Sequence, residues 1–310
     1  MAILFYNLND DPSLWRDAFM SFMPRADFRV FPDQVGDPGD IEYALVWKPR
    51  PGDMARFPNL RAMFVLGAGV DAMIHDSTLP THIPLVRLVD PAMTRGMTEW
   101  VIYWVLHFHR DFQIYGEQRR RNFWKRYPAW LTPDRRIGIL GMGELGQDAA
   151  RKLKALEFDV AGWSRTPKSM RGIECFSGAD GLARFLTRTH ILVCLLPLTK
   201  ETEGIVNARM LAALPKGAYV INAARGAHVV DQDLIQALDS GHLAGAALDA
   251  FRVEPLPADH LFWRHPKIEI TPHSSGPTFY RSASREIALN VKRMMRGKSP
   301  LNIVDRARGY

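Results

Sequence analysis

The sequence contains little cysteine. Cys175 and Cys194 are the only two cysteines among its 310 residues, which excludes a disulfide framework. Cys194 lies in the apolar run HILVCLLP, where a reduced, buried thiol is expected. This cysteine usage fits a reducing compartment, and we expect a cytoplasmic protein.

The sequence also lacks long apolar runs. Its most apolar helix-like stretch, WVIYWVLHFHR (100–110), is shorter than the roughly 20 residues that a membrane span requires. The N-terminal stretch MAILFYNLNDD has no basic region, and acids follow its short apolar run at once. This pattern favours a first strand over a signal peptide.

Acidic residues are fewer than basic ones, with 33 Asp and Glu against 40 Lys and Arg and a net charge of +7. Such an excess can attract DNA, an anionic surface, an anionic metabolite or a phosphorylated cofactor. The densest basic cluster, EQRRRNFWKRY (117–127), has interleaved aromatic residues but matches no nucleic-acid-binding motif, so we interpret it as a solvated helix face. No His or Cys pair has metal-ligand spacing. We therefore expect no nucleic acid, membrane or metal partner.

Strand-like runs alternate with helical patterns along nearly the whole chain, which predicts an α/β protein with parallel sheets and crossover helices. Two domains are expected at this length, because single cores rarely grow past about 250 to 300 residues. The first half has strand-like runs at AILFYN, YALVW, LRAMFVLGAG and IPLVRLV, and it contains no glycine fingerprint of its own.

The second half has the strands and helices of a complete dinucleotide-binding sheet. Before it, apolar spacing predicts a helix over 97–115, and Pro128 and Pro133 then mark a junction because a helix cannot easily continue there. A last helix over 279–297 can return to the first domain. The strands predicted in the second half are 136–140, 158–163, 190–196, 217–224, 245–251 and 268–273, with helices at 145–156 and 231–241.

A glycine pattern lies between the apolar run RIGIL and a strongly amphipathic helical pattern. Its members are Gly141, Gly143 and Gly146. Alone such a pattern is weak evidence, because glycines also make turns for structural reasons. Between a strand and a helix, however, it allows close backbone approach and offers the N–H groups of the helix N-terminus to a pyrophosphate. The turn therefore predicts dinucleotide binding.

The acidic side chain that usually follows about twenty residues later, and that holds a cofactor ribose, is missing. Ser164 and Arg165 occupy its place, with Lys168 just beyond. A carboxylate would repel a ribose 2′-phosphate, whereas a hydroxyl and a guanidinium favour it through charge-assisted hydrogen bonds. These residues predict NADP(H). The alternative, that Arg165 and Lys168 are solvated loop charges of an NAD enzyme, stays open.

Titratable side chains follow three later predicted strands. Arg225 follows YVINAA, Asp249 and Glu254 lie in AALDAFRVEPLP, and His273 ends IEITPH. Ligands of open parallel sheets collect at the carboxyl ends of strands, so these residues can meet there. Arginine can bind a carboxylate, and histidine can exchange a proton beside an orienting carboxylate. Each residue alone also has an ordinary structural explanation.

Several motifs together resemble one family. GMGELG, LPLTKETEGIVN, INAARG, LDAFRVEPLP and TPHSS have the order and spacing found in the D-isomer-specific 2-hydroxyacid dehydrogenases, over nearly the whole chain. VLGAGVDAM, VWKP, the tryptophan-rich helix and WSRTPK are most similar to the glyoxylate/hydroxypyruvate reductase A type of that family. The missing acid departs from the family and argues against NAD. The SSG after His273, where alanines are common, is neutral.

The resemblance implies roles for individual residues. Arg225 would bind the carboxylate and carbonyl of a 2-keto acid, and His273, paired with Glu254, would be the general acid in reduction. Trp47 would line the substrate pocket, and the backbone amides of Leu66–Val70 would cradle the substrate carboxylate. The cofactor-binding positions are Gly141, Gly143, Glu144, Leu145, Gly146, Ser164, Arg165, Lys168, Leu196, Pro197, Ala223, Ala224 and Asp249, and the cradle residues are Gly67, Ala68 and Gly69.

These roles predict the NADPH-dependent reduction of glyoxylate, hydroxypyruvate or another small 2-keto acid to a 2-hydroxy acid by hydride transfer. The bulk of Trp47 and Trp130 favours a small substrate. We expect a homodimer, as is usual in the family, with a substrate-binding domain of residues 1–96 and 277–310 and an NADP(H)-binding Rossmann domain of residues 97–276.

Two alternatives stay open at this point. One is an NAD-dependent dehydrogenase of the same family that acts on another 2-hydroxy acid, such as lactate or phosphoglycerate. The other is a transcriptional corepressor that uses the fold and a bound dinucleotide as a scaffold. Intact Arg225, Glu254 and His273 argue for chemistry, and the sequence lacks the long tails that such corepressors often add.

Overall fold

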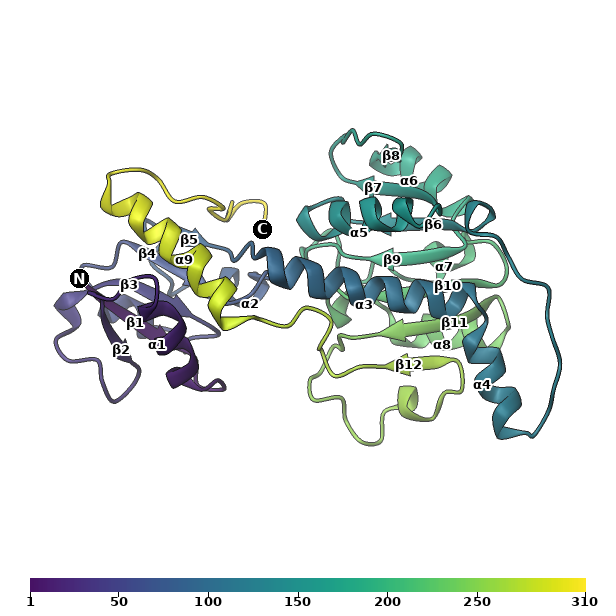
Figure 1. Ribbon diagram of the computed structural model, residues 1–310, viewed down its shortest axis with the longest axis horizontal. Coiled ribbons are helices and arrows are strands. Elements are labelled where there is room, and N and C mark those ends of the chain that lie inside the picture. The colour runs from purple at the N-terminus through teal and green to yellow at the C-terminus, as the bar shows by residue number, and fades with distance from the viewer. The chain divides into compact units, whose positions relative to one another are not determined.

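The computed structural model describes residues 1–310, which form two compact units. The first unit contains Met1–Met93 and Thr278–Tyr310, and the second contains Thr94–Pro277 (Figure 1). The chain therefore leaves the first unit once and returns to it near its C-terminal end. Both sheets are parallel with helices between the strands, so the predicted α/β fold with two Rossmann-like units is confirmed.

None of the helices combines the length and the apolar character that crossing a membrane requires.

The first unit is built on a sheet of five parallel strands in the order β2-β1-β3-β4-β5. Trp15 and Phe19 of α1 and Ile287 of α9 are buried on one face of this sheet, and loops and α2 cover the other face. The elements are β1 (Ala2–Tyr6), α1 (Pro12–Met20), β2 (Asp27–Val30), η1 (Pro38–Asp40), β3 (Ile41–Val46), η2 (Asp53–Arg56), β4 (Ala62–Val65), α2 (Asp71–Ile74), β5 (Leu85–Val86) and α9 (Tyr280–Met295).

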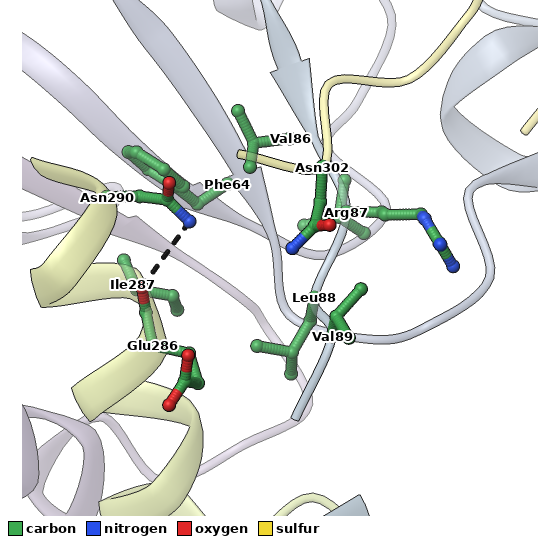
Figure 2. Close-up of a pocket in the computed structure, with 10 residues that line it drawn as sticks. Phe64, Val86, Arg87, Leu88, Val89, Glu286, Ile287, Asn290 and Asn302 are labelled. Atoms are coloured by element: carbon green, nitrogen blue, oxygen red, sulfur yellow. Dashed lines mark hydrogen bonds between the residues drawn. The ribbon is translucent and has the colours of Figure 1, made fainter. Parts of the chain in front are cut away.

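The C-terminal segment closes the free edge of this sheet. Ile303 pairs with Val86 of β5 in an antiparallel bridge, and the N–H of Leu301 donates to the side chain of Asn290 on α9 at 2.7 Å. A small pocket lies where this segment, the sheet and α9 meet, with Asn290 and Asn302 on its wall (Figure 2). The tail thus protects a strand edge that would otherwise be free to pair.

The second unit is built on seven parallel strands in the order β12-β11-β10-β9-β6-β7-β8. Val105 of α3 and Ala149 of α5 pack on one face, and Phe185 of α6, Met210 of α7 and Leu234 of α8 pack on the other (Figure 1). The elements are α3 (Pro91–His109), α4 (Phe112–Arg120), η3 (Thr132–Asp134), β6 (Arg136–Leu140), α5 (Glu144–Ala155), β7 (Asp159–Ser164), β8 (Glu174–Ser177), α6 (Gly178–Thr187), β9 (Ile191–Cys194), α7 (Ala208–Ala212), β10 (Ala218–Asn222), η4 (Gly226–His228), α8 (Asp231–Asp239), β11 (Leu243–Leu248), η5 (Leu261–Arg264) and β12 (Ile268–Ile270).

Two expectations for the region before β6 are wrong. The single helix predicted over 97–115 is two helices, α3 and α4, because the backbone of Asp111 is left-handed (φ +55°) and interrupts the helical hydrogen bonds. Pro128 and Pro133 lie inside the second unit and mark no junction. Helix α4 already ends at Arg120, and Pro133 lies near the start of η3. The chain between them is exposed, and the ring of Trp130 contacts Arg135 of the same unit.

The two cysteines are both free thiols. Cys194, on the central strand β9, is completely buried, and this burial raises the pKa of its thiol to about 12. A thiol that stays protonated is a poor nucleophile. Cys194 therefore acts as a small apolar side chain of the core.

Candidate active site

The glycine turn between β6 and α5 has the geometry that an anion site needs. Gly141 is left-handed (φ +104°), and a Cβ there would lie 2.6 Å from the carbonyl oxygen of Leu195. A Cβ on Gly146 would lie 1.8 Å from the carbonyl oxygen of Gly141. Gly143, the N-cap residue of α5, faces open space, and no side chain caps the first N–H groups of that helix. These N–H groups and the open space beside them fit the pyrophosphate of a dinucleotide.

The residues expected at the ribose lie at the end of β7. Ser164 is buried, and its hydroxyl donates to the carbonyl oxygen of Thr166 at 2.8 Å. Arg165 and Lys168 are exposed on the loop that follows. Hydrogen bonding by Thr199 lowers the pKa of the Glu201 carboxyl, and the nearby Arg165 guanidinium lowers it further. The loop after β9 therefore lies close to Arg165, which follows β7.

Leu196, Pro197, Ala223 and Ala224 lie together at the carboxyl ends of two neighbouring strands. Leu196 and Pro197 follow β9, and the alanines follow β10. The N–H of Ala223 donates to the carbonyl oxygen of Cys194 at 3.3 Å, which joins the two strand ends. The glycine turn follows β6, the neighbour of β9 on its other side. These expected cofactor residues thus share the edge of the sheet that carries the glycine turn.

His273 and Glu254 form a hydrogen-bonded pair beyond that same edge. Nδ1 of the imidazole lies 2.8 Å from Oε2 and 3.0 Å from Oε1 of the carboxylate. The Oε1 atom also accepts the N–H of Phe251 at 2.9 Å, which fixes the carboxylate. Because an ionised carboxylate only accepts hydrogen bonds, Nδ1 carries the proton of this contact and Nε2 is left for proton exchange with a ligand.

The backbone of His273 is held in a conformation that is unfavourable for a residue with a side chain. Its φ is +52°, in the left-handed region. The N–H of His273 donates to the carbonyl oxygen of Asp249 at 2.8 Å. The buried carboxylate of Asp249 accepts the Thr271 hydroxyl at 2.5 Å and the backbone N–H groups of Ser274 and Ser275 at 2.8 and 2.9 Å. Asp249 therefore forms hydrogen bonds with residues before and after His273 in the loop that carries the histidine.

Trp100 adds a contact that the sequence did not indicate. The indole N–H of this residue, on α3, donates to the hydroxyl oxygen of Thr271 at 3.2 Å. Thr271 in turn donates to Asp249, so α3, β12 and β11 are joined by one chain of hydrogen bonds. The apolar helical spacing around Trp100 indicated only a core residue.

Arg225 follows β10 and is partly buried. Its Nη1 atom donates to the carbonyl oxygen of Ala224 at 2.9 Å. The next residue, Gly226, packs so closely against the chain after β11 that a Cβ would lie 1.9 Å from the carbonyl carbon of Phe251. Phe251 is also the residue whose N–H binds Glu254. The structure thus brings the chain at Arg225 against the segment that carries Glu254, the partner of His273.

The expected substrate residues of the first unit also contact one another. Trp47 follows β3 and the Leu66–Val70 loop follows the adjacent strand β4. A Cβ on Gly67 would lie 2.6 Å from the ring of Trp47, so only glycine lets the indole lie this close to the loop. The exposed Lys48 side chain extends over the same indole, with Nζ 5.7 Å from the ring centroid.

Trp130 does not lie where a pocket residue of the same chain was expected. Its ring packs against the guanidinium of Arg135, 4.5 Å away, and edge-on to His190, with 5.4 Å between ring centroids. Arg135 precedes β6 and His190 precedes β9, so these contacts lie at the amino-terminal edge of the sheet. The catalytic candidates lie at the carboxyl-terminal edge. Within this chain, Trp130 therefore does not lie beside the catalytic candidates, where the sequence analysis expected it to add bulk.

Comparison with known proteins shows to which protein family the chain belongs. Residues 102–275 match the family model of the D-isomer specific 2-hydroxyacid dehydrogenase NAD binding domain, and the chain belongs to this family, as its motifs predicted. It is 41% identical over 315 residues to glyoxylate/hydroxypyruvate reductase A of Serratia proteamaculans, with all of both chains covered.

Solved structures agree with this membership. A D-isomer specific 2-hydroxyacid dehydrogenase from Xanthobacter autotrophicus, in complex with NADPH and MES, has a TM-score of 0.97 and 43% identity, with 100% of this chain and 99% of that chain covered. The NADPH-dependent glyoxylate/hydroxypyruvate reductase of Sinorhizobium meliloti, in complex with NADP and sulfate, has a TM-score of 0.94 and 37% identity, with both chains covered completely.

Proposed function

We propose that this protein is an NADPH-dependent reductase of small 2-keto acids, with glyoxylate and hydroxypyruvate as substrates. The observation that carries the proposal is the hydrogen-bonded pair of His273 and Glu254, in the same unit as Arg225 and the glycine turn. The reductases from Serratia and Sinorhizobium, matched over the full chain, support the substrate class.

The cofactor is NADP(H), and groups of the second unit hold it. The N–H groups at the start of α5, beside Gly143, bind the pyrophosphate. Ser164, Arg165 and Lys168 bind the 2′-phosphate, since a hydroxyl and two cations are complementary to a dianion. Bound NADPH supplies the hydride that adds to the keto carbon. Leu196, Pro197, Ala223, Ala224 and Asp249 belong to the segments that we assign to the side of the nicotinamide.

His273 and Arg225 act on the oxygen of the keto group. Protonated His273 gives a proton from Nε2 to the oxygen that becomes the alkoxide, and Glu254 stabilises the imidazolium through Nδ1. The guanidinium of Arg225 binds the substrate carboxylate and places positive charge where the oxygen gains negative charge, which stabilises the transition state. In the reverse direction, neutral His273 accepts the proton of the hydroxy acid.

The Leu66–Val70 loop of the first unit is by itself suited to bind a carboxylate. The backbone N–H groups of Gly67, Ala68 and Gly69 are suited to bind an anion, and the indole of Trp47 packs directly on this loop. The bulk of the Trp47 indole beside this loop favours a small acid over one with a long side chain.

The test is the steady-state oxidation of NADPH and NADH with glyoxylate, hydroxypyruvate, pyruvate and phenylpyruvate. We expect a strong preference for NADPH and for the two small substrates. Faster reduction of phenylpyruvate than of glyoxylate would contradict the assigned substrate class, and a preference for NADH would contradict the assigned role of Arg165. The His273→Ala variant is expected to lose turnover by a far larger factor than it loses NADPH affinity.

We also propose that the protein is a cytoplasmic homodimer. Large apolar side chains are exposed in and after α4, with Phe112, Trp124 and Leu131 exposed by 55, 93 and 70%. A second copy of the chain would cover them in an isologous interface. Light scattering on the purified protein tests the dimer, and Trp124→Glu is expected to weaken it. The two free cysteines fit a reducing compartment.

A further inference from the structure

His228 has no part in the proposed reaction, although it lies beside the residues that carry it. It ends the short helix η4, three residues after Arg225, and it is completely buried. A buried histidine needs partners for both ring nitrogens, because burial of an unpaired polar group costs free energy. The partners of His228 are backbone groups of two segments that we assign to the active site.

One ring nitrogen contacts Arg225, and the other contacts Pro197. Nδ1 lies 3.1 Å from the backbone nitrogen of Arg225 and 3.1 Å from its carbonyl oxygen. Nε2 lies 3.2 Å from the carbonyl oxygen of Pro197, in the loop after β9. The imidazole therefore lies between the backbone of the substrate-binding arginine and the loop assigned to the cofactor.

The surrounding hydrogen bonds determine which nitrogen carries the proton. Because Pro197 offers only a carbonyl oxygen, Nε2 must be the donor. The carbonyl oxygen of Arg225 already accepts the side-chain amide of Asn222 at 2.9 Å and the backbone N–H of His228 at 3.2 Å. Nδ1 is then the acceptor for the N–H of Arg225. A neutral imidazole with its proton on Nε2 satisfies every one of these groups.

The main chain near His228 is fastened to the same loop at other points. The N–H of Val206 donates to the carbonyl oxygen of His228 at 2.9 Å, and the N–H of Gly204 donates to that of Ala227 at 2.8 Å. These bonds fix the far end of the loop after β9. Among these contacts, the imidazole is the one that reaches the near end of the loop, at Pro197.

We propose that His228 is a positioning residue. Through the two nitrogens of its ring it fixes the position of the substrate-binding arginine relative to the cofactor-binding loop. The Nδ1 bond holds the backbone of Arg225, and the Nε2 bond holds Pro197. This inference rests on the roles proposed above for Arg225 and for the loop at Pro197. It gives each ring nitrogen a different function, which two substitutions can separate.

Asparagine and glutamine each retain one of the two hydrogen-bonding positions of the imidazole. The side-chain oxygen of asparagine occupies the position of Nδ1 and can accept the N–H of Arg225, but asparagine is too short to reach Pro197. The side-chain nitrogen of glutamine occupies the position of Nε2 and can donate to Pro197, but no acceptor remains for Arg225. His228→Gln thus removes one contact, and His228→Asn removes the other.

The experiment measures binding as well as turnover. NADPH affinity is measured by fluorescence titration. Substrate-site affinity is measured with oxalate, which carries the carboxylate and adjacent oxygen of a 2-keto acid, in the presence of NADP⁺. For His228→Gln we expect the Kd of oxalate and the KM of glyoxylate to rise about fivefold, with the Kd of NADPH changed less than twofold. For His228→Asn we expect the opposite pattern, because one hydrogen bond contributes a factor of this size.

The matched control is His242→Gln, which alters another histidine that contacts a backbone carbonyl, that of Leu211, through Nε2 at 2.9 Å. This control is expected to change neither affinity. Equal changes of both affinities in the two His228 variants, no change in either, or loss of folding in both as judged by thermal unfolding would overturn the inference.

A third substitution separates this inference from the proposed function. Arg225→Lys is expected to raise the KM of glyoxylate and the Kd of oxalate strongly. If it does so while His228→Gln does not, only the positioning role fails. If Arg225→Lys leaves both constants unchanged, the assigned role of Arg225 fails first.

Discussion

Asp249 binds the backbone N–H of Ser275 at 2.9 Å, through a carboxylate that is almost completely buried. The other carboxylate oxygen accepts Thr271 and Ser274. This buried carboxylate accepts hydrogen bonds from three uncharged groups. Its contacts therefore fix the conformation of one loop. In this protein the loop carries His273.

Replacing Asp249 by asparagine should therefore disturb the catalytic histidine. The amide group cannot accept at its nitrogen, so at least one buried N–H loses its partner, at a cost of about 1–3 kcal/mol in the free energy of unfolding. We expect a lower kcat and a lower Tm. Asp259→Asn, at an exposed position in the chain before β12, is the matched control and should change neither. An unchanged kcat in Asp249→Asn would show that the loop holds its shape without the carboxylate.

Two glycines of the turn after β6 should respond differently to alanine. Gly146→Ala places a Cβ 1.8 Å from a backbone oxygen, so the turn must shift, and we expect the free energy of unfolding to fall by about 1–3 kcal/mol. Gly143→Ala meets no atom within 4 Å, so the fold should keep its stability. The added methyl group nevertheless occupies the space assigned to the pyrophosphate.

We therefore expect Gly143→Ala to weaken NADPH binding at an unchanged Tm. Urea denaturation and fluorescence titration of NADPH measure the two quantities separately. Loss of stability without loss of affinity in Gly143→Ala would mean that the pyrophosphate binds elsewhere.

Arg165 should discriminate between the two nicotinamide cofactors. Arg165→Ala removes a cation from the proposed 2′-phosphate site, and we expect the Kd of NADPH to rise about tenfold or more, in line with a charge-assisted hydrogen bond of about 1.5–3 kcal/mol. The Kd of NADH should change little. Arg171→Ala, an exposed arginine further along the same loop, controls for a general loss of positive charge. If Arg165→Ala and Arg171→Ala raised the Kd of NADPH equally, the positive charge of the loop would attract the cofactor without a specific 2′-phosphate site.

His190 should make stability depend on pH. Burial, followed by the charges of Arg136, Arg135 and Arg188, lowers its pKa to about 4, whereas an unfolded histidine has a pKa of about 6.5. Between these values the unfolded chain binds more protons than the folded chain. The stability contributed by neutral His190 is therefore complete above pH 6.5 and falls as the pH drops towards 4.

From pH 7 to pH 5 this loss amounts to about 2 kcal/mol. His190→Gln should remove that part of the pH dependence, as measured by urea denaturation at both pH values. His82→Gln, at an exposed histidine of the first unit, should leave it unchanged. If the wild-type protein and His190→Gln lose the same stability between pH 7 and pH 5, His190 does not bind its proton as the structure indicates.

The sequence predicted the central strands of both sheets and the glycine turn because apolar runs bounded by glycine are a strong local signal. It did not predict β2 and β8, which lie at sheet edges, because these strands carry exposed or half-buried side chains in DFRV and ECFS. Edge strands need less apolar surface, and their local pattern is correspondingly weak.

The pairing of Glu254 with His273 followed from the motifs, but the supporting contacts did not. Trp100 and Thr271 meet across 171 residues of sequence, and no local spacing encodes such a contact. Trp130 was misplaced for the same reason, because an aromatic residue in an irregular segment gives no indication of which sheet edge it will contact. His228 lies two residues after a recognised motif, INAARG, and only its burial and its two backbone partners distinguish it.

The first unit is discontinuous in sequence, and this has a consequence for synthesis. Ala283, Ile287 and Val291 of α9 are part of its core, yet they follow the whole of the second unit along the chain. A ribosome therefore releases every residue of the second unit before it releases the helix that completes the first. Until then α1 covers that face of the N-terminal sheet without α9, so the part of the protein that is made first is the last to finish folding.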